Sequence, residues 1–150
     1  MAIRKPNLLD TIDVVAKLDD AVTCDDDKYD EYLETLDEDL LQLDGVPTRF
    51  RLKKYLTASQ QDKIDDLKTR QEGKKLKVSL GFMAEDVRQS LVSIINPDDM
   101  PEADRLELEL GKDKKATPEF VATLRDIGVV SNLYNARSSS HKQKKDLKKS

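Results

Sequence analysis

The chain has 150 residues, of which 37% are charged and 37% hydrophobic, and its net charge is −4. This length favours one domain, and the absence of Trp leaves Leu, Ile and Val to build a modest core. The single cysteine, Cys24, excludes an intrachain disulfide, and the sequence contains neither a signal peptide nor the ~20 apolar residues of a membrane span. We therefore expect a cytoplasmic protein that does not contact membranes.

The charges are distributed unevenly along the chain. Residues 1–45 contain 14 acidic and 4 basic residues, whereas residues 49–77 contain 10 basic and 4 acidic residues. The last segment, residues 137–150, has 6 basic residues and 1 acidic residue. The basic tail of one copy could lie along the acidic head of a neighbour, or bind another acidic protein or nucleic acid. The alternative is that both ends are solvated surfaces without a partner.

The first third of the chain is expected to be helical after a short arm at residues 1–6. Asn7 is a candidate cap for a helix. Its apolar stripe consists of Leu8, Ile12, Val15, Leu18 and Val22. A second helix is expected to begin between Thr23 and Asp27, because acidic residues suit a helix N-terminus. Its apolar face follows a 3.6-residue period through Tyr29, Tyr32, Leu33, Leu36, Leu40 and Leu43, until Gly45 and Pro47 end it.

The middle of the chain contains the clearest strand. Phe50 and Leu52 alternate with Arg49, Arg51 and Lys53, which places apolar and basic side chains on opposite faces. A polar helix follows, from a cap at Ser59 to about Gly73. Residues 74–83 fit a strand or a helix equally well. A further helix is expected from Ala84 to Ile95, and Asn96-Pro97 ends it.

The C-terminal third ends in a basic tail. Residues 104–110 fit either a strand or a short helix, whereas Thr117-Pro118-Glu119 is a strong helix start. Gly128 is expected to interrupt this last helix. Beyond residue 136 no apolar face continues, so residues 137–150 are expected to be disordered when free. The sequence thus predicts an arm, a single helix-rich domain at 7–136 and a tail. The fold class is α+β, mostly α-helical, with four to six helices and a small β element near residues 46–56.

No residue pattern indicates catalysis, a cofactor or a metal site. The only histidine, His141, lies in the tail without a partner that could orient it. Cys24 precedes three aspartates, which disfavour a reactive thiolate. The run Asp25-Asp26-Asp27 lacks the glycine and the spacing of a calcium loop, and the scattered glycines form no phosphate-binding motif. We therefore expect a protein that is not an enzyme. Whether the acidic head binds cations stays open at this point.

The order of elements carries a resemblance. It runs from the acidic head through Val46-Pro47-Thr48-Arg49-Phe50-Arg51-Leu52-Lys53 and Leu56-Thr57 to a polar helix, then to Leu80-Gly81-Phe82 and a final helix from Phe120 to Asn135. Over roughly residues 44–136 this order resembles small bacteriophage morphogenesis proteins, in particular tail assembly chaperones. The resemblance implies a non-enzymatic component that binds other virion or tail proteins during assembly. A small head–tail connector or another structural virion protein fits equally well.

The residues expected to bind partners form three groups. They are Tyr29, Tyr32, Leu36 and Leu40 on the second helix, Arg49, Arg51 and Lys53 on the strand, and Lys142, Lys144 and Lys145 in the tail. The expected partners are virion or tail proteins in the host cytoplasm, or further copies of this chain. The alternative is a helical adaptor or accessory protein whose basic tail contacts nucleic acid non-specifically.

Overall fold

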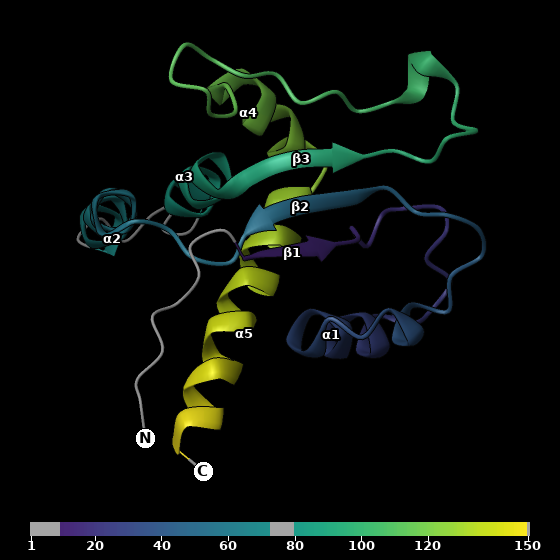
Figure 1. The fold of residues 1–150 in the computed structure, drawn as a ribbon, viewed down its shortest axis with the longest axis horizontal. Helices are drawn as coiled ribbons and strands as arrows, with labels where there is room; N and C mark the ends of the chain where they lie inside the picture. Colours follow the sequence, from purple (N-terminus) through teal and green to yellow (C-terminus); the bar gives the residue numbers. More distant parts are fainter. Residues whose placement is uncertain (1–9, 73–79, 150) are drawn as a thin grey trace.

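A computed structural model describes residues 10–72 and 80–149, without the side chains of residues 69–72, 80 and 141–149. These residues form five α-helices and one three-stranded antiparallel sheet, which confirms the predicted α+β class with mostly helical content. Figure 1 shows the sheet at the centre, with α3 (Leu80–Ser90) and α2 (Ala58–Glu72) beyond one end of it and α1 (Asp26–Thr35) beside the other. The last helix, α5 (Val129–Lys149), crosses behind the sheet and continues past it.

The sheet has the predicted strand at its centre. Its order is β1 (Thr11–Val14), β2 (Arg49–Lys53) and β3 (Leu91–Ile95), and both pairings are antiparallel. Phe50 and Leu52 are 2% and 0% exposed, whereas the three basic residues of β2 are half-buried on the opposite face. The predicted division of this strand into an apolar and a basic face is therefore confirmed.

Two predicted helices are wrong where the structure has β1 and β3. The residues after Asp10 pair with β2 instead of forming the first helix, whose proposed cap, Asn7, lies outside the described residues. The helix predicted to reach Ile95 ends at Ser90, the last residue of α3 (Leu80–Ser90), and Asn96-Pro97 follows a strand instead. Both segments are short and rich in β-branched residues. Hydrophobic periodicity alone does not distinguish a buried strand from a helix in such short runs. Pairing with β2 determines that both segments form strands.

The second predicted helix begins as expected and ends early. The Asp25 carboxylate accepts a hydrogen bond from the Lys28 N–H at 2.9 Å and caps α1 (Asp26–Thr35). Leu36 then adopts a φ of +57°, and Asp37 caps the 3₁₀ helix η1 (Glu38–Leu41) through the Asp39 N–H. The prediction of one continuous helix to Leu43 is wrong, because the Asp37 side chain offers the backbone a competing local hydrogen bond. Gly45, with a φ of +98°, lies in the following turn and not at a helix end.

Caps define the starts of α2 (Ala58–Glu72) and α4 (Pro118–Asp126). The Gln60 N–H donates to the Thr57 hydroxyl at 3.2 Å, and the Thr57 N–H donates to the Gln60 side chain at 3.0 Å. This reciprocal pair is a capping box, so the predicted cap at Ser59 is two residues late. Thr117 caps α4 by accepting from the Phe120 N–H, as predicted. Gly128, with a φ of +79°, then separates α4 from α5.

Residues 96–116 form a long loop between β3 and α4. It contains the 3₁₀ helix η2 (Glu102–Asp104), and residues 105–109 form no helix or strand, in contrast to the strand or short helix expected there. Leu110 forms an isolated bridge with Ala116. Of the other ambiguous segment, residues 74–83, the part at 74–79 lies outside the described residues and the part at 80–83 is helical.

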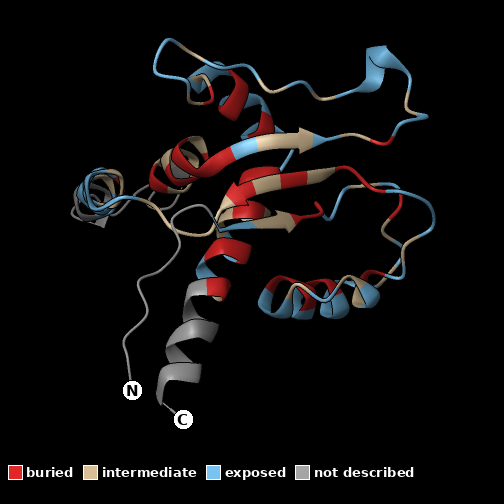
Figure 2. Ribbon diagram, viewed as in Figure 1, coloured by how far each residue is buried: buried red, intermediate tan, exposed pale blue. Residues whose placement is uncertain are grey.

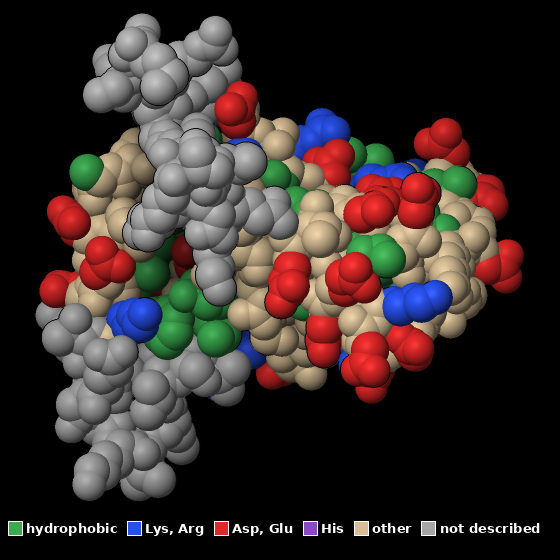
Figure 3. Space-filling model, turned by 90° about the horizontal axis from the view of Figure 1, so that it is seen from below, with side chains coloured by type: hydrophobic (Ala, Val, Ile, Leu, Met, Phe, Trp, Pro, Cys, Tyr) green, Lys and Arg blue, Asp and Glu red, His purple; other side chains and the backbone are tan. Residues whose placement is uncertain are grey.

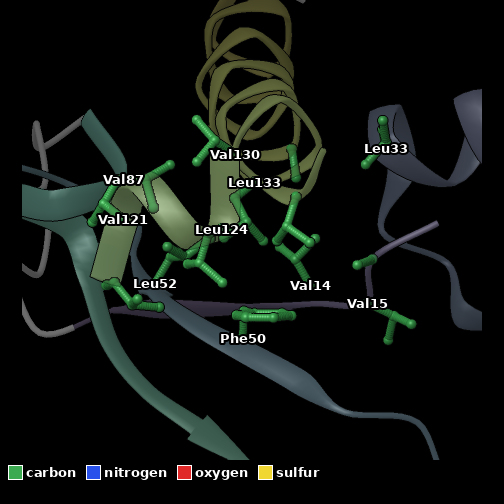
Figure 4. Packing of buried hydrophobic residues seen from close by; sticks show 14 of the residues in the cluster. Val14, Val15, Leu33, Phe50, Leu52, Val87, Val121, Leu124, Val130 and Leu133 are labelled. Atoms are coloured by element: carbon green, nitrogen blue, oxygen red, sulfur yellow. The ribbon is translucent and has the colours of Figure 1, made fainter. Parts of the chain in front are cut away.

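The hydrophobic core lies between the sheet and α4 and α5. Figure 4 shows Leu124, Val130 and Leu133 of these helices gathered against Phe50 and Leu52 of β2. Each of these five side chains is at most 2% exposed. In Figure 2, buried residues lie on β2, on parts of α3 and α4, on the inner side of α1 and on the first part of α5, while much of the loop after β3 and the outer side of α1 are exposed.

Helix α5 (Val129–Lys149) extends beyond the predicted domain boundary at residue 136. Arg137 is only 3% exposed and forms a buried ion pair with Asp86 of α3, while its Nε donates to the Lys53 carbonyl oxygen at 2.9 Å. Ser140 is also buried. The helix then continues to Lys149, where the sequence predicts a disordered tail. Lys and Gln have high helix propensity, which favours helix even without an apolar stripe.

Two tyrosines of α1 form hydrogen bonds with the backbone just after β1. The Tyr29 hydroxyl donates to the Val15 carbonyl oxygen at 2.8 Å, and the Val15 N–H donates to the Tyr32 hydroxyl oxygen at 2.9 Å. Both side chains are at most 1% exposed. Burial raises the pKa of both phenols above the usual value, and it raises the pKa of Tyr32 to about 12.

We expect the free energy of unfolding to fall when the pH rises above about 10. Below that pH both phenols are protonated in the folded and unfolded states. Their ionisation therefore does not reduce the free energy of unfolding in that range. Above it the unfolded state ionises first, and stability is lost until the pH passes the raised pKa values of the folded state. Thermal melts between about pH 8 and about pH 11 measure this, and Tyr32→Phe should make the decline shallower. Equal slopes for the two proteins would contradict the assignment.

Candidate functional site

The predicted partner-binding residues of the second helix lie in or against the core. Tyr29 and Tyr32 are buried, as described above, and Leu36 and Leu40 are half-buried and pack against the hydrophobic core. The apolar stripe of α1 therefore faces the protein's own interior. These four residues, which the sequence predicts to bind partners, contribute to the protein's own core instead.

The arginines of β2 are bound to carboxylates on the outer face of the sheet. Arg49 forms hydrogen bonds of 2.7 and 3.2 Å with Glu38, and Arg51 forms hydrogen bonds of 2.9 and 3.2 Å with Asp13. These hydrogen bonds raise the pKa of both guanidinium groups. The two arginines therefore do not form a bare cationic strip. Lys53 lies beside them and is half-buried.

The tail lysines belong to the far end of α5. The backbone of Lys142, Lys144 and Lys145 is helical, and their side chains lie outside the described part of the chain. The structure therefore does not bring them together with the arginines of β2 into one described site.

A groove of about 650 Å³ lies at the end of the sheet where β2 begins and β3 ends. Three segments form its walls: the turn at residues 16–21 after β1, the turn at 44–48 before β2, and the loop at 96–106 after β3. Figure 1 shows these segments at the right-hand end of the sheet. The buried side chains of Phe50 and Val129 also line the groove, which connects it directly to the core.

Hydrogen bonds hold the walls in place. The Asp19 carboxylate accepts from the Ala21 N–H at 3.0 Å and from the Thr48 N–H at 2.8 Å, which ties the first turn to the second. The Asn96 side chain donates to the Leu106 carbonyl oxygen at 2.9 Å and accepts from the Leu106 N–H at 3.2 Å. The groove is therefore a preformed feature, as binding sites commonly are.

Exposed hydrophobic side chains gather in this groove. The described residues expose six large hydrophobic side chains, and three of them line it: Leu18 at 54%, Val46 at 64% and Ile127 at 44%. The half-buried Met100 and Leu106 add to the same surface. Single exposed hydrophobic residues are ordinary, but a cluster of them in a concave surface is typical of a binding site.

The rim of the groove is acidic. Five aspartates and no basic residue are among the described residues that line it: Asp19, Asp20, Asp44, Asp99 and Asp104. All except Asp19 are exposed, and they form no ion pair with the residues whose side chains the structure describes. Figure 3 shows that carboxylates are also spread widely over the face on which α1 lies. This combination suits a ligand that is both cationic and partly apolar.

The carboxylates of the groove do not converge on one point. No three His, Cys, Asp or Glu side chains of the described residues are placed to hold a metal ion together. Acidic groups spread along a rim match charges that are spread along a ligand, as in a peptide with several Lys or Arg side chains. The geometry therefore favours an extended basic segment over a single cation.

Sequence reasoning identified the acidic head but not the groove. Three of the five aspartates lie in residues 1–45, the acidic head. The other two lie in the loop at residues 96–106, which reaches the groove only because β3 pairs with β2. A local signal was present in Leu18-Asp19-Asp20, Asp44-Gly45-Val46 and Asp99-Met100, where an apolar residue stands beside aspartate in a turn-like segment.

Comparison of the chain with protein-family models, with curated proteins and with solved structures found no match. Within the described residues, no helix has the length and apolar character needed to cross a membrane. The functional assignment therefore depends on the residues and geometry of the groove.

Proposed function

We propose that this chain is a non-enzymatic, protein-binding assembly component whose groove binds a basic segment of a partner protein. The groove carries the proposal, because it combines exposed apolar side chains with an acidic rim. Rim carboxylates attract Lys or Arg side chains, and Leu18, Val46 and Ile127 contact their methylene stems or an apolar residue between them. Three of the six large hydrophobic side chains that the described residues expose gather here, so the groove is a defined docking surface.

The assembly we propose is a bacteriophage virion or tail. The order of elements over residues 44–136, with its resemblance to tail assembly chaperones, supports this proposal. A small domain with a preformed groove and oppositely charged ends suits a protein that holds other assembly proteins in the host cytoplasm. It equally suits a connector-type protein that stays in the particle.

A helical adaptor or accessory protein with a nucleic-acid-binding tail is the second candidate. The lysines at the far end of α5 favour it, because phosphate binding requires little more than clustered positive charge. This candidate gives no role to the acidic groove, which would repel nucleic acid.

We expect the protein to bind a synthetic peptide of about twelve residues in which Lys and Leu alternate, and not the peptide with Glu in place of Lys. The triple variant Asp44→Asn, Asp99→Asn, Asp104→Asn should weaken this binding roughly three- to hundred-fold, because it removes three exposed charge pairs at ~0.2–1 kcal/mol each. Fluorescence anisotropy of the labelled peptide measures the dissociation constants.

A matched control removes the same charge elsewhere on the surface. Asp30, Asp62 and Asp126 lie on α1, α2 and α4, are exposed and do not line the groove. Their triple replacement by Asn should leave peptide binding nearly unchanged. Equal losses in the two triple variants would show that binding follows net charge and not the groove, and would refute the proposal.

A further inference from the structure

We infer that the basic end of α5 in one copy of the chain occupies the acidic groove of a second copy, so that the chain associates head to tail. The inference rests on the proposed function of the groove and names its partner. It commits to one occupant, residues 142–149 of a second copy.

The chemistry of the tail complements that of the groove. Residues 142–149 contain five lysines, one aspartate and a single apolar residue, Leu147, with lysines on both sides of it. The groove offers five aspartates around exposed apolar side chains, with no basic residue among its described lining. Because lysine stems are apolar and their ammonium groups are cationic, one short segment can satisfy both parts of the groove.

Geometry requires that the tail and the groove belong to different molecules. Val129 lines the groove and is also the first residue of α5. The helix has 21 residues, and at ~1.5 Å per residue its end lies ~30 Å from Val129. A continuous helix therefore carries its own lysines away from its own groove, as the course of α5 in Figure 1 shows.

The first part of α5 is fixed to the body of the domain. Leu133 and Ala136 are fully buried, and Arg137 is tied to Asp86 and to the Lys53 carbonyl oxygen. The helix therefore cannot swing as a unit towards its own groove without breaking a buried ion pair. Docking in a neighbouring molecule requires no such change.

Head-to-tail docking has a direct consequence for the assembly. The groove and the tail are different surfaces, so each docked copy still presents one groove and one tail. Such heterologous contacts form either closed rings or open filaments. Exposed ion pairs are weak singly, so the association should depend on several lysines at once and should weaken as salt screens them.

Two full-length variants test the inference by complementation. One carries Asp44→Asn, Asp99→Asn and Asp104→Asn, and the other carries Gln in place of Lys142, Lys144, Lys145, Lys148 and Lys149. Sedimentation analysis of nuclease-treated protein at low salt should give the wild type a mass above 17.0 kDa that rises with concentration. Each variant alone should be monomeric. Their mixture should form a dimer and nothing larger, because only one intact groove and one intact tail meet.

The controls separate failure of this inference from failure of the proposed function. Circular dichroism establishes that both variants are folded, and the Asp30, Asp62 and Asp126 triple variant should associate like the wild type. A wild type that stays monomeric, or a mixture without dimer, overturns the inference. If the Lys–Leu peptide still binds in that case, the groove is a docking site for another protein. If the peptide does not bind either, the proposed function fails as well.

Discussion

Replacing Arg137 by Ala is expected to lower the free energy of unfolding by about 3–5 kcal/mol. The Arg137 and Asp86 side chains are 4% and 6% exposed, so this ion pair is among the most deeply buried polar contacts of the described residues. Removing the guanidinium takes away the ion-pair partner of a buried carboxylate. It also removes a hydrogen-bond donor to the Lys53 carbonyl oxygen at the end of β2.

Urea denaturation of the single and double alanine variants measures this effect. The double variant Asp86→Ala, Arg137→Ala should lose less stability than the two single losses added together, because it removes both members of the buried ion pair at once. Lys17→Ala is the matched surface variant, since Lys17 pairs with Asp26 at exposed positions, and it should leave the free energy of unfolding nearly unchanged. A loss below about 1 kcal/mol for Arg137→Ala would contradict the burial of this pair.

Replacing Leu41 by Ala is expected to cost about 2–5 kcal/mol of stability, whereas Leu40→Ala should cost about 1 kcal/mol. Leu41 is completely buried in the core, and its neighbour Leu40 is only half-buried. The change from α1 to η1 determines this difference, because it turns Leu41 and not Leu40 towards the interior. A helix continuing to Leu43 would instead bury Leu40.

The two leucine variants control for each other, since they remove the same atoms from adjacent positions. Chemical denaturation at one pH and salt concentration measures both free energies of unfolding. If Leu40→Ala proved the more costly change, the 3₁₀ segment would be wrong and the continuous helix correct.

The elements that sequence reasoning predicted correctly are those with local signals. The alternation in β2, the Thr117-Pro118 start of α4 and the break at Gly128 each depend on a few neighbouring residues. The elements that it missed depend on distant partners. Asp13 lies opposite Arg51 in the sheet, 38 positions away in the sequence, and nothing near Asp13 indicates that pairing. A strand at the edge of a sheet is thus determined by its neighbour more than by its own residues.

The candidate site also has one part with a local sequence signal and one part that depends on distant contacts. The acidic character of residues 1–45 was evident from composition, and it supplies Asp19, Asp20 and Asp44 to the groove. The residues after β3 complete the groove only because β3 is a strand and its following loop is held by Asn96. The buried role of Arg137 was also hidden, because a charged residue beside a lysine-rich segment resembles the start of a solvated tail.

The groove as a docking site for a basic segment is tested most directly by methyl NMR of the full chain titrated with the Lys–Leu peptide. The proposal predicts that methyl signals of Leu18, Val46, Leu106 and Ile127 shift together as the peptide binds. Val92 and Leu110 are also exposed but lie outside the groove, so their signals should stay in place. Absence of shifts in the groove, or equal shifts at Val92 and Leu110, would contradict the proposed function.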